Sequence, residues 1–488
     1  MASPRKSKAA PAPLGRYLRR FTLQNVRTFR SPVTLDFCNS DGTVAQWTVI
    51  LGENGTGKTT LLQYLAGMMP TDKMDLNLLR APGLRFEEPP LGPALAGRDW
   101  AMWHFENLPQ TASKDLKIKA SLDFSEAAPT PGLARAASDG TGQAKLLVGF
   151  RAKTRPFETN GLGEWSTRPA EFLGQFHLFG YGASRHVAGS ASPYLSSETF
   201  FKNGGSEPTS TLFHDDYPLI SPEQWLLGLD HTSRSDGEVA KAAKRSLNSA
   251  RRCMINTLPG IKDIAVKQRE GAKGQPAMTL MCTTNYGEVP FSALSLGYQT
   301  MSAWLIDFVK RMHEAFPDLE EPDNGPAIVL IDEFDLHMHP HWQREAMAAL
   351  TKEFPNTQFI VTAHSPIVVQ ATEGHAKLIV LRRKQMEDGT EEVIADDDPK
   401  FAAGWRVDQI LESLYGMSPR MENYEKLVER RVELRQKEKL TGSEQVELAE
   451  VEAQLDKEAP PVASAATEQL LTDLKKALNR GEKQRLRK

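Results

Sequence analysis

The segment GENGTGKT at Gly52–Thr59 constrains the fold of this chain more than any other feature. It matches the pattern GxxxxGK followed by Ser or Thr, with an apolar, β-rich run before it at 47–51 and a helix-like segment after it at 59–68. In this context the loop amides and the helix N-terminus together attract an anion. An ordinary glycine-rich turn would need neither Lys58 nor the Thr59 hydroxyl. The sequence therefore predicts a phosphate-binding loop (P-loop) in an α/β fold.

The ligands expected at this loop are ATP and Mg2+. Lys58 is placed to reach the β- and γ-phosphates, and the Thr59 hydroxyl is expected to be a magnesium ligand. The residues expected to bind the nucleotide in this segment are Gly52, Glu53, Asn54, Gly55, Thr56, Gly57, Lys58, Thr59 and Thr60.

A second magnesium ligand and a group that activates water are expected farther along the chain. The apolar run AIVLI at 327–331 is followed directly by Asp332 and Glu333. Such a run is typical of a buried parallel strand, whose C-terminal end is where α/β folds bind ligands. Asp332 is therefore predicted to hold magnesium, and Glu333 to be the catalytic base. The next strand, at 358–362, ends just before His364, which is expected to act catalytically near the γ-phosphate.

Three alternating histidines follow the acids, at His337, His339 and His341. On a strand they would share one face, which would suit zinc. However, Pro340 favours the first turn of a helix, and helix-forming residues follow it. We therefore expect a loop after the acids and a helix from His341 onward, with the zinc site as the alternative.

The segment SALSLGYQ carries a further motif, since Leu294, Ser295, Gly297 and Gln299 resemble the LSGGQ signature of ABC-type ATPases. Taken alone, these residues also describe an ordinary helix cap. Their place in the chain is more specific, because P-loop, insertion, signature, acids and histidine follow the order of SMC, RecF and ABC-type heads. This resemblance implies that Ser295, Gly297 and Gln299 bind nucleotide held by a second subunit. It therefore implies a head-to-tail homodimer with shared ATP sites, and leaves open a higher oligomer.

Three longer segments indicate more closely which ATPases this chain resembles. The stretches at 20–37, at 181–186 and from 329 to 366 are similar to bacterial ATPases of the OLD and PtuA kind. PtuA-like ATPases belong to Septu anti-phage systems, have relatives beside retrons, and work with an HNH nuclease. OLD proteins instead carry a TOPRIM nuclease domain after the head. This chain departs from OLD there, because the region after 385 is mostly helical in pattern and the acids of IADDDP lack the expected strand context.

Arg185 lies in the segment YGASRH, after the apolar run FHLFG. ABC-type heads place at this position a loop that carries a glutamine near magnesium. Here Gln175 comes before the strand, so that assignment does not transfer. Arg185 is the candidate nucleotide sensor, and a purely structural arginine is the alternative.

The predicted fold class is α/β: an ABC-type P-loop NTPase head with a mixed sheet, an inserted β-rich and helical lobe, and a C-terminal helical hairpin. We expect a basic disordered tail at 1–15 and the N-terminal part of the head at 16–70. An insertion and helical lobe follow at 71–290, the C-terminal part of the head at 291–385, and a helical region at 386–488. Thr441 and Glu444 have capping-box spacing at the start of the second hairpin helix.

Composition limits the kinds of partner and the cellular location that we expect for this protein. The net charge of −3 gives no global signal for nucleic acid, and the three cysteines form no metal or disulfide pattern. No run approaches the roughly 18 apolar residues of a spanning helix, and the N-terminus lacks a signal-peptide core, so we expect a cytoplasmic protein without a membrane partner. Basic residues within 241–252 either contact DNA or form a solvated helix face. These residues are Lys241, Lys244, Arg245, Arg251 and Arg252.

The function expected from these features is ATP hydrolysis at a dimer interface that regulates a separate nuclease in anti-phage defence. One alternative is a RecF-like or SMC-like DNA-repair ATPase that binds DNA directly. Another is a nucleotide-gated scaffold with little turnover.

Overall fold

The computed structural model describes residues 15–67, 117–127, 141–149, 177–185, 187, 209–213, 215, 217–270, 276–372, 376–387, 389–397, 405–416, 422–437 and 440–458. The chain divides into two compact units, residues 1–410 and 411–488, each with its own contacts.

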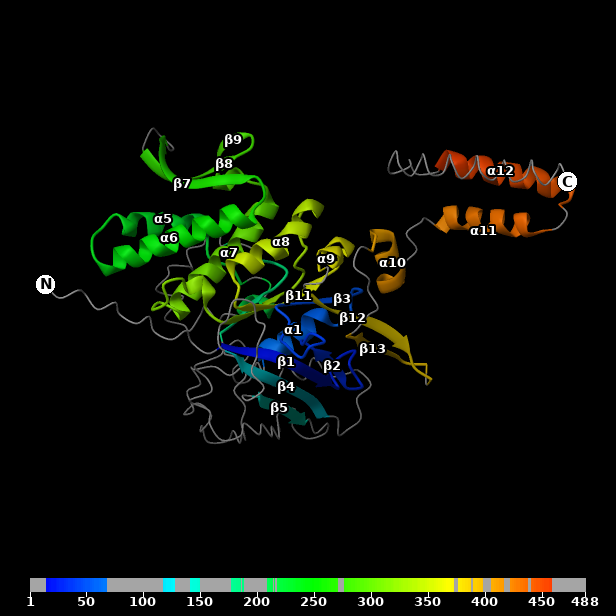
Figure 1. Cartoon of the computed structure of the whole chain (residues 1–488), viewed down its shortest axis with the longest axis horizontal. Coiled ribbons are helices and arrows are strands. Elements are labelled where there is room, and N and C mark those ends of the chain that lie inside the picture. Colours follow the sequence, from blue (N-terminus) through cyan, green and yellow to red (C-terminus); the bar gives the residue numbers. More distant parts are fainter. Residues whose placement is uncertain are drawn as a thin grey trace. The chain divides into compact units, whose positions relative to one another are not determined.

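A six-stranded sheet in the order β13-β12-β3-β11-β10-β6 forms the centre of the first unit (Figure 1). Neighbouring strands are parallel except for β12 and β13. Strands β3, β6, β10 and β11 are buried along their whole length, as expected for parallel strands covered on both faces. The mixed α/β fold class is therefore confirmed. The strands are β3 (Trp47–Gly52), β6 (Leu178–Tyr181), β10 (Ala327–Ile331), β11 (Thr357–Ala363), β12 (Ala376–Gln385) and β13 (Glu391–Asp396).

An antiparallel sheet in the order β2-β1-β4-β5 packs against this one. Its strands are β1 (Gly15–Gln24), β2 (Val33–Asp36), β4 (Lys117–Ala127) and β5 (Thr141–Gly149). The buried Gln358 of β11 joins the two sheets, because its amide bonds both the N–H and the carbonyl of Leu18, at 2.8 and 2.9 Å. In the sequence, apolar and polar residues alternate at 116–124, a pattern that predicts a strand, and β4 confirms it. The segment 144–154 also reads as a strand; β5 covers it as far as residue 149, and the rest lies outside the described residues.

The helical part of the first unit contains α5 and α6 side by side, next to β7 and β8 (Figure 1). Its elements are α5 (Pro222–Ser233), α6 (Glu238–Thr257), β7 (Ile261–Glu270), β8 (Pro276–Thr284), β9 (Gly287–Pro290), α7 (Leu296–Ala315), α8 (Pro340–Glu353) and α9 (Pro366–Ala371). Buried positions on α6 recur at helical spacing, from Ala240 through Ala243 and Leu247 to Met254. This pattern accounts for its packing on α7 and α8.

Four of the five basic residues of α6 form bonds within the protein. Arg252 bonds Asp323 and Glu353, at 2.9 and 3.1 Å. Arg245 donates to two backbone carbonyls, while Arg251 and Lys241 pair with carboxylates. Arg245 and Arg252 are thus held within the protein, whereas Lys241 and Arg251 form ion pairs on the solvated face of the helix. Lys244 is exposed.

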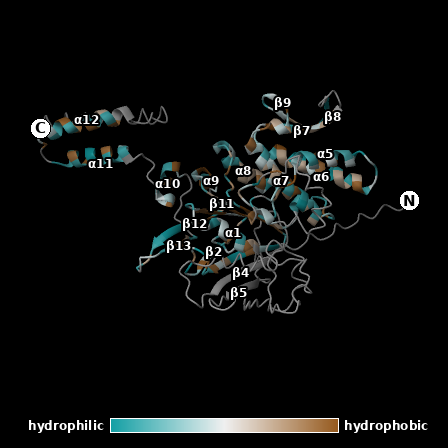
Figure 2. Ribbon diagram, turned by 180° about the vertical axis from the view of Figure 1, so that it is seen from behind, coloured by the Kyte–Doolittle hydropathy of each residue, from teal (hydrophilic) through white to brown (hydrophobic). Residues whose placement is uncertain are grey.

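Strand β13 corrects one expectation, since the region after 385 was expected to be helical and the acids of IADDDP to lack a strand. The segment EEVIAD pairs antiparallel with β12, and Val393 is buried against the core. The outer part of β12 and β13 is hydrophilic (Figure 2), so this edge ribbon has little of the apolar pattern that signals a strand. Backbone pairing with β12, and not apolar periodicity, accounts for it.

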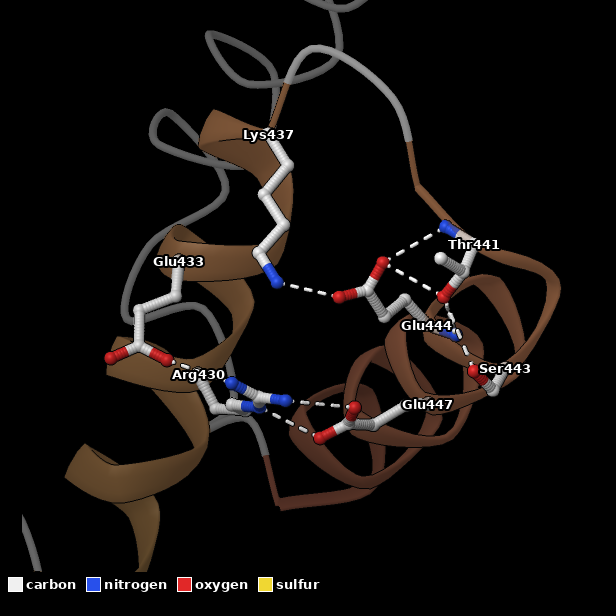
Figure 3. Close-up of polar contacts among 7 residues, drawn as sticks. All are labelled: Arg430, Glu433, Lys437, Thr441, Ser443, Glu444 and Glu447. Atoms are coloured by element: carbon white, nitrogen blue, oxygen red, sulfur yellow. Dashed lines mark hydrogen bonds and ion pairs between the residues drawn. The ribbon is translucent and has the colours of Figure 1, made fainter.

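The second unit contains a helical hairpin of α11 (Glu422–Gln436) and α12 (Gly442–Glu458), which confirms the expected shape. Thr441 and Glu444 form the predicted capping box: the Thr441 N–H donates to Oε2 at 2.8 Å, and the Glu444 N–H donates to Oγ1 at 3.4 Å (Figure 3). Arg430 binds both carboxylate oxygens of Glu447, at 2.7 and 2.9 Å. Leucines at helical spacing, Leu470, Leu471, Leu474 and Leu478, predict a further helix, which lies outside the described residues. A further helix, α10 (Val407–Tyr415), spans the boundary of the two units.

Candidate functional site

The loop between β3 and α1 (Lys58–Gly67) has the conformation that its glycines allow. Gly55 and Gly57 have φ of +78° and +90°, where other residues are strained. A Cβ on Gly57 would meet the Phe29 ring at 2.6 Å, and one on Gly52 would meet Thr56 Oγ1 at 2.6 Å. The loop is therefore a tight cradle of backbone amides at a helix N-terminus, which is the donor set that phosphate needs.

Lys58 lies within this cradle. Its ammonium donates to the carbonyls of Gly52 and Glu53, at 2.7 and 3.0 Å, and the side chain is almost fully buried. Burial lowers the pKa of Lys58, and the nearby carboxylates, Asp332 first among them, oppose that shift. Phosphate oxygens can replace these two carbonyl acceptors, because a hydrogen bond from the Lys58 ammonium to a charged oxygen is stronger than one to a neutral carbonyl.

Thr59 and Asp332 meet, although they are 273 positions apart. The Thr59 hydroxyl donates to Asp332 Oδ2 at 2.5 Å, and the Thr362 hydroxyl donates to Oδ1 at 2.5 Å. Asp332 itself is buried. A hydroxyl and a carboxylate side by side next to a phosphate cradle are the oxygen donors that Mg2+ prefers, so the residues fit this ion. Sequence reasoning missed Thr362, whose only signal is a polar residue at the end of an apolar strand.

Glu333 follows Asp332 with φ of +49°, so the backbone turns sharply at this residue. The Glu333 N–H donates to Thr362 Oγ1 at 2.8 Å, and its carbonyl accepts from Arg185 Nη2 at 2.5 Å. Thr362 belongs to β11, and Arg185 lies in the loop after β6. They hold the backbone of the glutamate in place, and among the described residues no hydrogen bond engages its carboxylate.

Arg185 is buried, and φ at this residue is +34°. Burial lowers the pKa of Arg185 to about 10, against the opposing charges of Asp332, Glu333 and Asp335. Its Nε has no hydrogen-bond partner among the described residues. The structure thus brings the predicted sensor to the acids, and its contact with nucleotide stays a prediction.

His364 lies at the same edge, after β11. Its backbone N–H donates to Asp335 Oδ2 at 3.1 Å. Burial and the charge of Lys58 lower the pKa of His364, while Asp335, Glu333 and Asp332 oppose this. The imidazole is therefore biased toward its neutral form. Asp335 is a second residue that sequence reasoning missed, although it is the third acid of DEFD.

Two arginines also reach the P-loop without having been predicted. Arg383 of β12 donates to the Asn54 carbonyl at 2.9 Å and lies 4.0 Å from the Glu53 carboxylate. Arg27 donates to Thr60 Oγ1 at 3.0 Å. Neither has a motif around it, and only the sheet and the loop after β1 bring them to the site.

The signature segment opens α7. Ser295 is the N-cap residue, exposed to solvent and without a side-chain capping bond, and the next residue, Leu296, is 63% exposed. A Cβ on Gly297 would lie 2.4 Å from the His337 carbonyl, so only glycine allows this approach of α7 to the loop after the acids. Gln299 donates to the Leu294 carbonyl at 2.7 Å. The exposed serine faces solvent, as a residue that acts on a second molecule must.

The alternating histidines do not lie on a strand. Residue 340 begins α8, as the proline predicted, and His339 accepts from the His341 N–H at 3.3 Å through its ring nitrogen. His337 has φ of +64° in the preceding turn. The shared strand face that the zinc alternative required is therefore not formed.

Comparisons with known proteins agree with this geometry. A family model described as "AAA domain" matches residues 20–73, and one described as "AAA domain, putative AbiEii toxin, Type IV TA system" matches residues 215–370. The "Retron Vc95 probable ATPase" of Vibrio cholerae serotype O1 biovar El Tor is 43% identical over 94 residues, covering 19% of this chain and 18% of the relative.

Two further relatives match longer segments. The "Retron Ec83 probable ATPase" of Escherichia coli is 29% identical over 187 residues, covering 38% of this chain and 31% of the relative. The "Septu protein PtuA" of Bacillus thuringiensis is 27% identical over 201 residues, covering 40% and 48%. The chain thus spans less than half the length of each of these three relatives.

Among solved structures, the SMC head bound to the C-terminal winged-helix domain of ScpA has a TM-score of 0.41 and 14% identity, covering 78% of this chain and 98% of that one. No helix among the described residues is long and apolar enough to cross a bilayer. With its P-loop and acids assembled at one sheet edge, the chain matches models of AAA domains over residues 20–73 and 215–370 and is similar to retron probable ATPases and to Septu PtuA.

Proposed function

We propose that this chain binds ATP with Mg2+ at the P-loop and hydrolyses it. The observation that carries the proposal is the hydrogen bond of 2.5 Å between Thr59 and Asp332. Thr59 lies in the first turn of α1, directly after the loop that follows β3, and Asp332 follows β10; both strands belong to the six-stranded sheet. A P-loop hydroxyl and a strand-end carboxylate in contact would serve as ligands of Mg2+, which would supply neutralisation of phosphate charge.

The other residues of the site have separate roles in binding and hydrolysis. Lys58 offsets the charge of the β- and γ-phosphates, and the loop amides hold them. Glu333 takes a proton from the attacking water, with its backbone fixed by Thr362 and Arg185. Burial and the charge of Lys58 lower the pKa of His364, which favours the neutral imidazole, and this ring offers a hydrogen bond near the γ-phosphate.

The chain is proposed to act as a head-to-tail homodimer. Ser295, Gly297 and Gln299 of one copy contact the nucleotide held by the P-loop of the other. Support comes from the exposure of Ser295 and Leu296 at the start of α7, where a second molecule can reach them. Assembly beyond the dimer is left open.

The biological role we propose is that of a regulatory cytoplasmic ATPase in anti-phage defence, with a separate HNH-type nuclease as its partner. The names of the relatives support the defence role, since two of them are retron ATPases and one is a Septu protein. Arg245 and Arg252 of α6 are bonded within the protein, which does not favour DNA contact by these two side chains. The domain boundaries expected from the sequence are retained as part of this proposal.

The experiment that tests the proposal is ATP titration and steady-state turnover of the full chain, with and without Mg2+, DNA and a nuclease encoded beside it. Turnover that requires Mg2+ and controls the nuclease is the expected result. Stimulation of the isolated chain by DNA would favour the DNA-repair alternative, and tight binding with negligible turnover would favour a scaffold. Absence of ATP binding at millimolar concentration would overturn the proposal.

A further inference from the structure

Helix α7 carries a buried ion pair on the side that faces β6. Arg311 Nε lies 2.6 Å from Asp307 Oδ2, and the two side chains are 12% and 3% exposed. The hydroxyl of Tyr181, the last residue of β6, donates to the same Oδ2 at 3.0 Å. Burial, together with the charge of Asp307, raises the pKa of Tyr181 well above its ordinary value, so the hydroxyl keeps its proton. Buried carboxylates are costly to leave without partners, so the bonds from Tyr181 and Arg311 to Asp307 stabilise the packing of β6 on α7.

Tyr181 is also the point at which β6 meets the candidate site. Its carbonyl accepts from the Asp332 N–H at 2.8 Å, and its ring lies against Trp304 of α7 with centroids 5.6 Å apart. The chain then continues through a short loop to Arg185, which holds the Glu333 carbonyl. A displacement of Tyr181 therefore acts on both acids, one directly and one through Arg185.

The same helix touches the site a second time at its N-terminal end. Gly297 packs against the His337 carbonyl so closely that a Cβ would lie 2.4 Å away. The N-terminal signature end of α7 thus contacts the loop after Glu333, and the middle of the same helix contacts β6, the strand before Arg185. Because a helix moves largely as a unit, these two contacts are linked.

We propose that Tyr181, Asp307 and Arg311 form a positioning unit through which α7 sets the place of Arg185 and Glu333. In the proposed dimer, the signature end of α7 contacts the nucleotide held by the second subunit, whereas Glu333 acts on the nucleotide held by its own P-loop. Movement of the signature end at the first nucleotide is thereby transmitted to the glutamate at the second. The link is a property of the single chain, while its use in ATP hydrolysis rests on the proposed function. Tyr181 is assigned here no contact with nucleotide, so its role is positioning.

The test compares Tyr181→Phe with Ser249→Ala in the full chain. Each variant removes one buried hydroxyl that donates to a buried aspartate, Asp307 in the first case and Asp323 in the control. Hydrogen exchange is measured without nucleotide at peptides covering residues 180–186 and 330–338. We expect roughly tenfold faster exchange in these peptides for Tyr181→Phe, as loss of a hydrogen bond to a charged group implies, and wild-type exchange there for the control.

A second measurement separates positioning from structural damage. ATP affinity of Tyr181→Phe is expected to stay within about twofold of wild type while kcat falls roughly tenfold, since the P-loop is untouched. Wild-type exchange in both peptides would overturn the proposal, and so would faster exchange spread evenly over α6 and β1, which would indicate general loosening. If the wild-type chain binds no ATP, the proposed function fails, yet the exchange experiment still decides whether the link exists.

Discussion

Replacing Ser295 with Arg tests whether the signature segment acts on a second molecule. In the structure Ser295 is exposed, its side chain makes no capping bond, and Leu296 beside it is 63% exposed. An N-cap that bonds its helix contributes about 1 kcal/mol, so the loss here should be smaller, within about 0.5 kcal/mol of unfolding free energy. The variant is therefore expected to fold and to melt as wild type does.

ATP binding should also survive, because the P-loop amides, Lys58 and Thr59 belong to other elements. Turnover should stop, since a bulky cation at the start of α7 would block the close approach of a second head. ATP-dependent dimerisation, followed by sedimentation, should disappear together with hydrolysis. Normal turnover by a monomeric Ser295→Arg protein would refute the signature assignment.

Mixing this variant with Lys58→Ala makes the test sharper. In a mixed dimer one shared site combines both intact halves, and the other combines both defects. Random pairing makes half of the dimers mixed, so the mixture should recover at most about a quarter of wild-type turnover. Recovery from two inactive proteins would demonstrate shared catalysis. A mixture that stays inactive although mixed dimers form would mean that the sites are obligately coupled or not shared.

Four further predictions concern single residues. Lys58→Ala should abolish nucleotide binding in an equilibrium titration, because the buried ammonium that offsets phosphate charge is lost; unchanged affinity would contradict the P-loop assignment. Glu333→Gln should lower turnover by roughly 100-fold while trapping ATP and prolonging the dimer, and wild-type turnover would remove Glu333 from the mechanism. Thr441→Ala should destabilise the α11–α12 hairpin by about 1 kcal/mol, measured by circular dichroism, and an unchanged melting curve would count against the capping box. Bonds from Lys437 and then Thr441 lower the pKa of Glu444 from its ordinary 4.5 to about 2. Its stabilisation is therefore complete above pH 4.5 and lost as pH falls toward 2, so hairpin helicity that is constant from pH 7 to 2 would contradict this.

The strands that carry the site could be predicted closely from the sequence. The runs at 47–51, 327–331 and 358–362 correspond to β3, β10 and β11 with ends that agree to within one residue. Strands buried on both faces are apolar at every position, so their signal lies within the strand itself. The edge strand β13 has no such signal, because its hydrogen bonds to β12 stabilise a polar segment that would not be read as a strand alone.

The residues of the candidate site likewise fall into two groups, those that the sequence predicted and those that it did not. Its P-loop and acids could be predicted because glycines, lysine and carboxylates occur there at a spacing that the chemistry requires. Thr362, Asp335, Arg383 and Arg27 could not, since each is an ordinary residue in its own segment. Their importance appears only where their bonds to Asp332, His364, Asn54 and Thr60 are formed.

The sequence by itself determined the phosphate loop, since Gly55 and Gly57 permit backbone angles that other residues resist, and it determined the buried strands on either side. Only the tertiary structure decided which side chains meet. Parallel strands place their C-terminal ends at one edge, and this brings Thr59 to Asp332 across 273 positions. The packing of α7 on β6 likewise brings Asp307 to Tyr181 across 126 positions. Such long-range contacts form when strands pair into a sheet and a helix packs against it. The residues within any one segment carry no signal for these contacts.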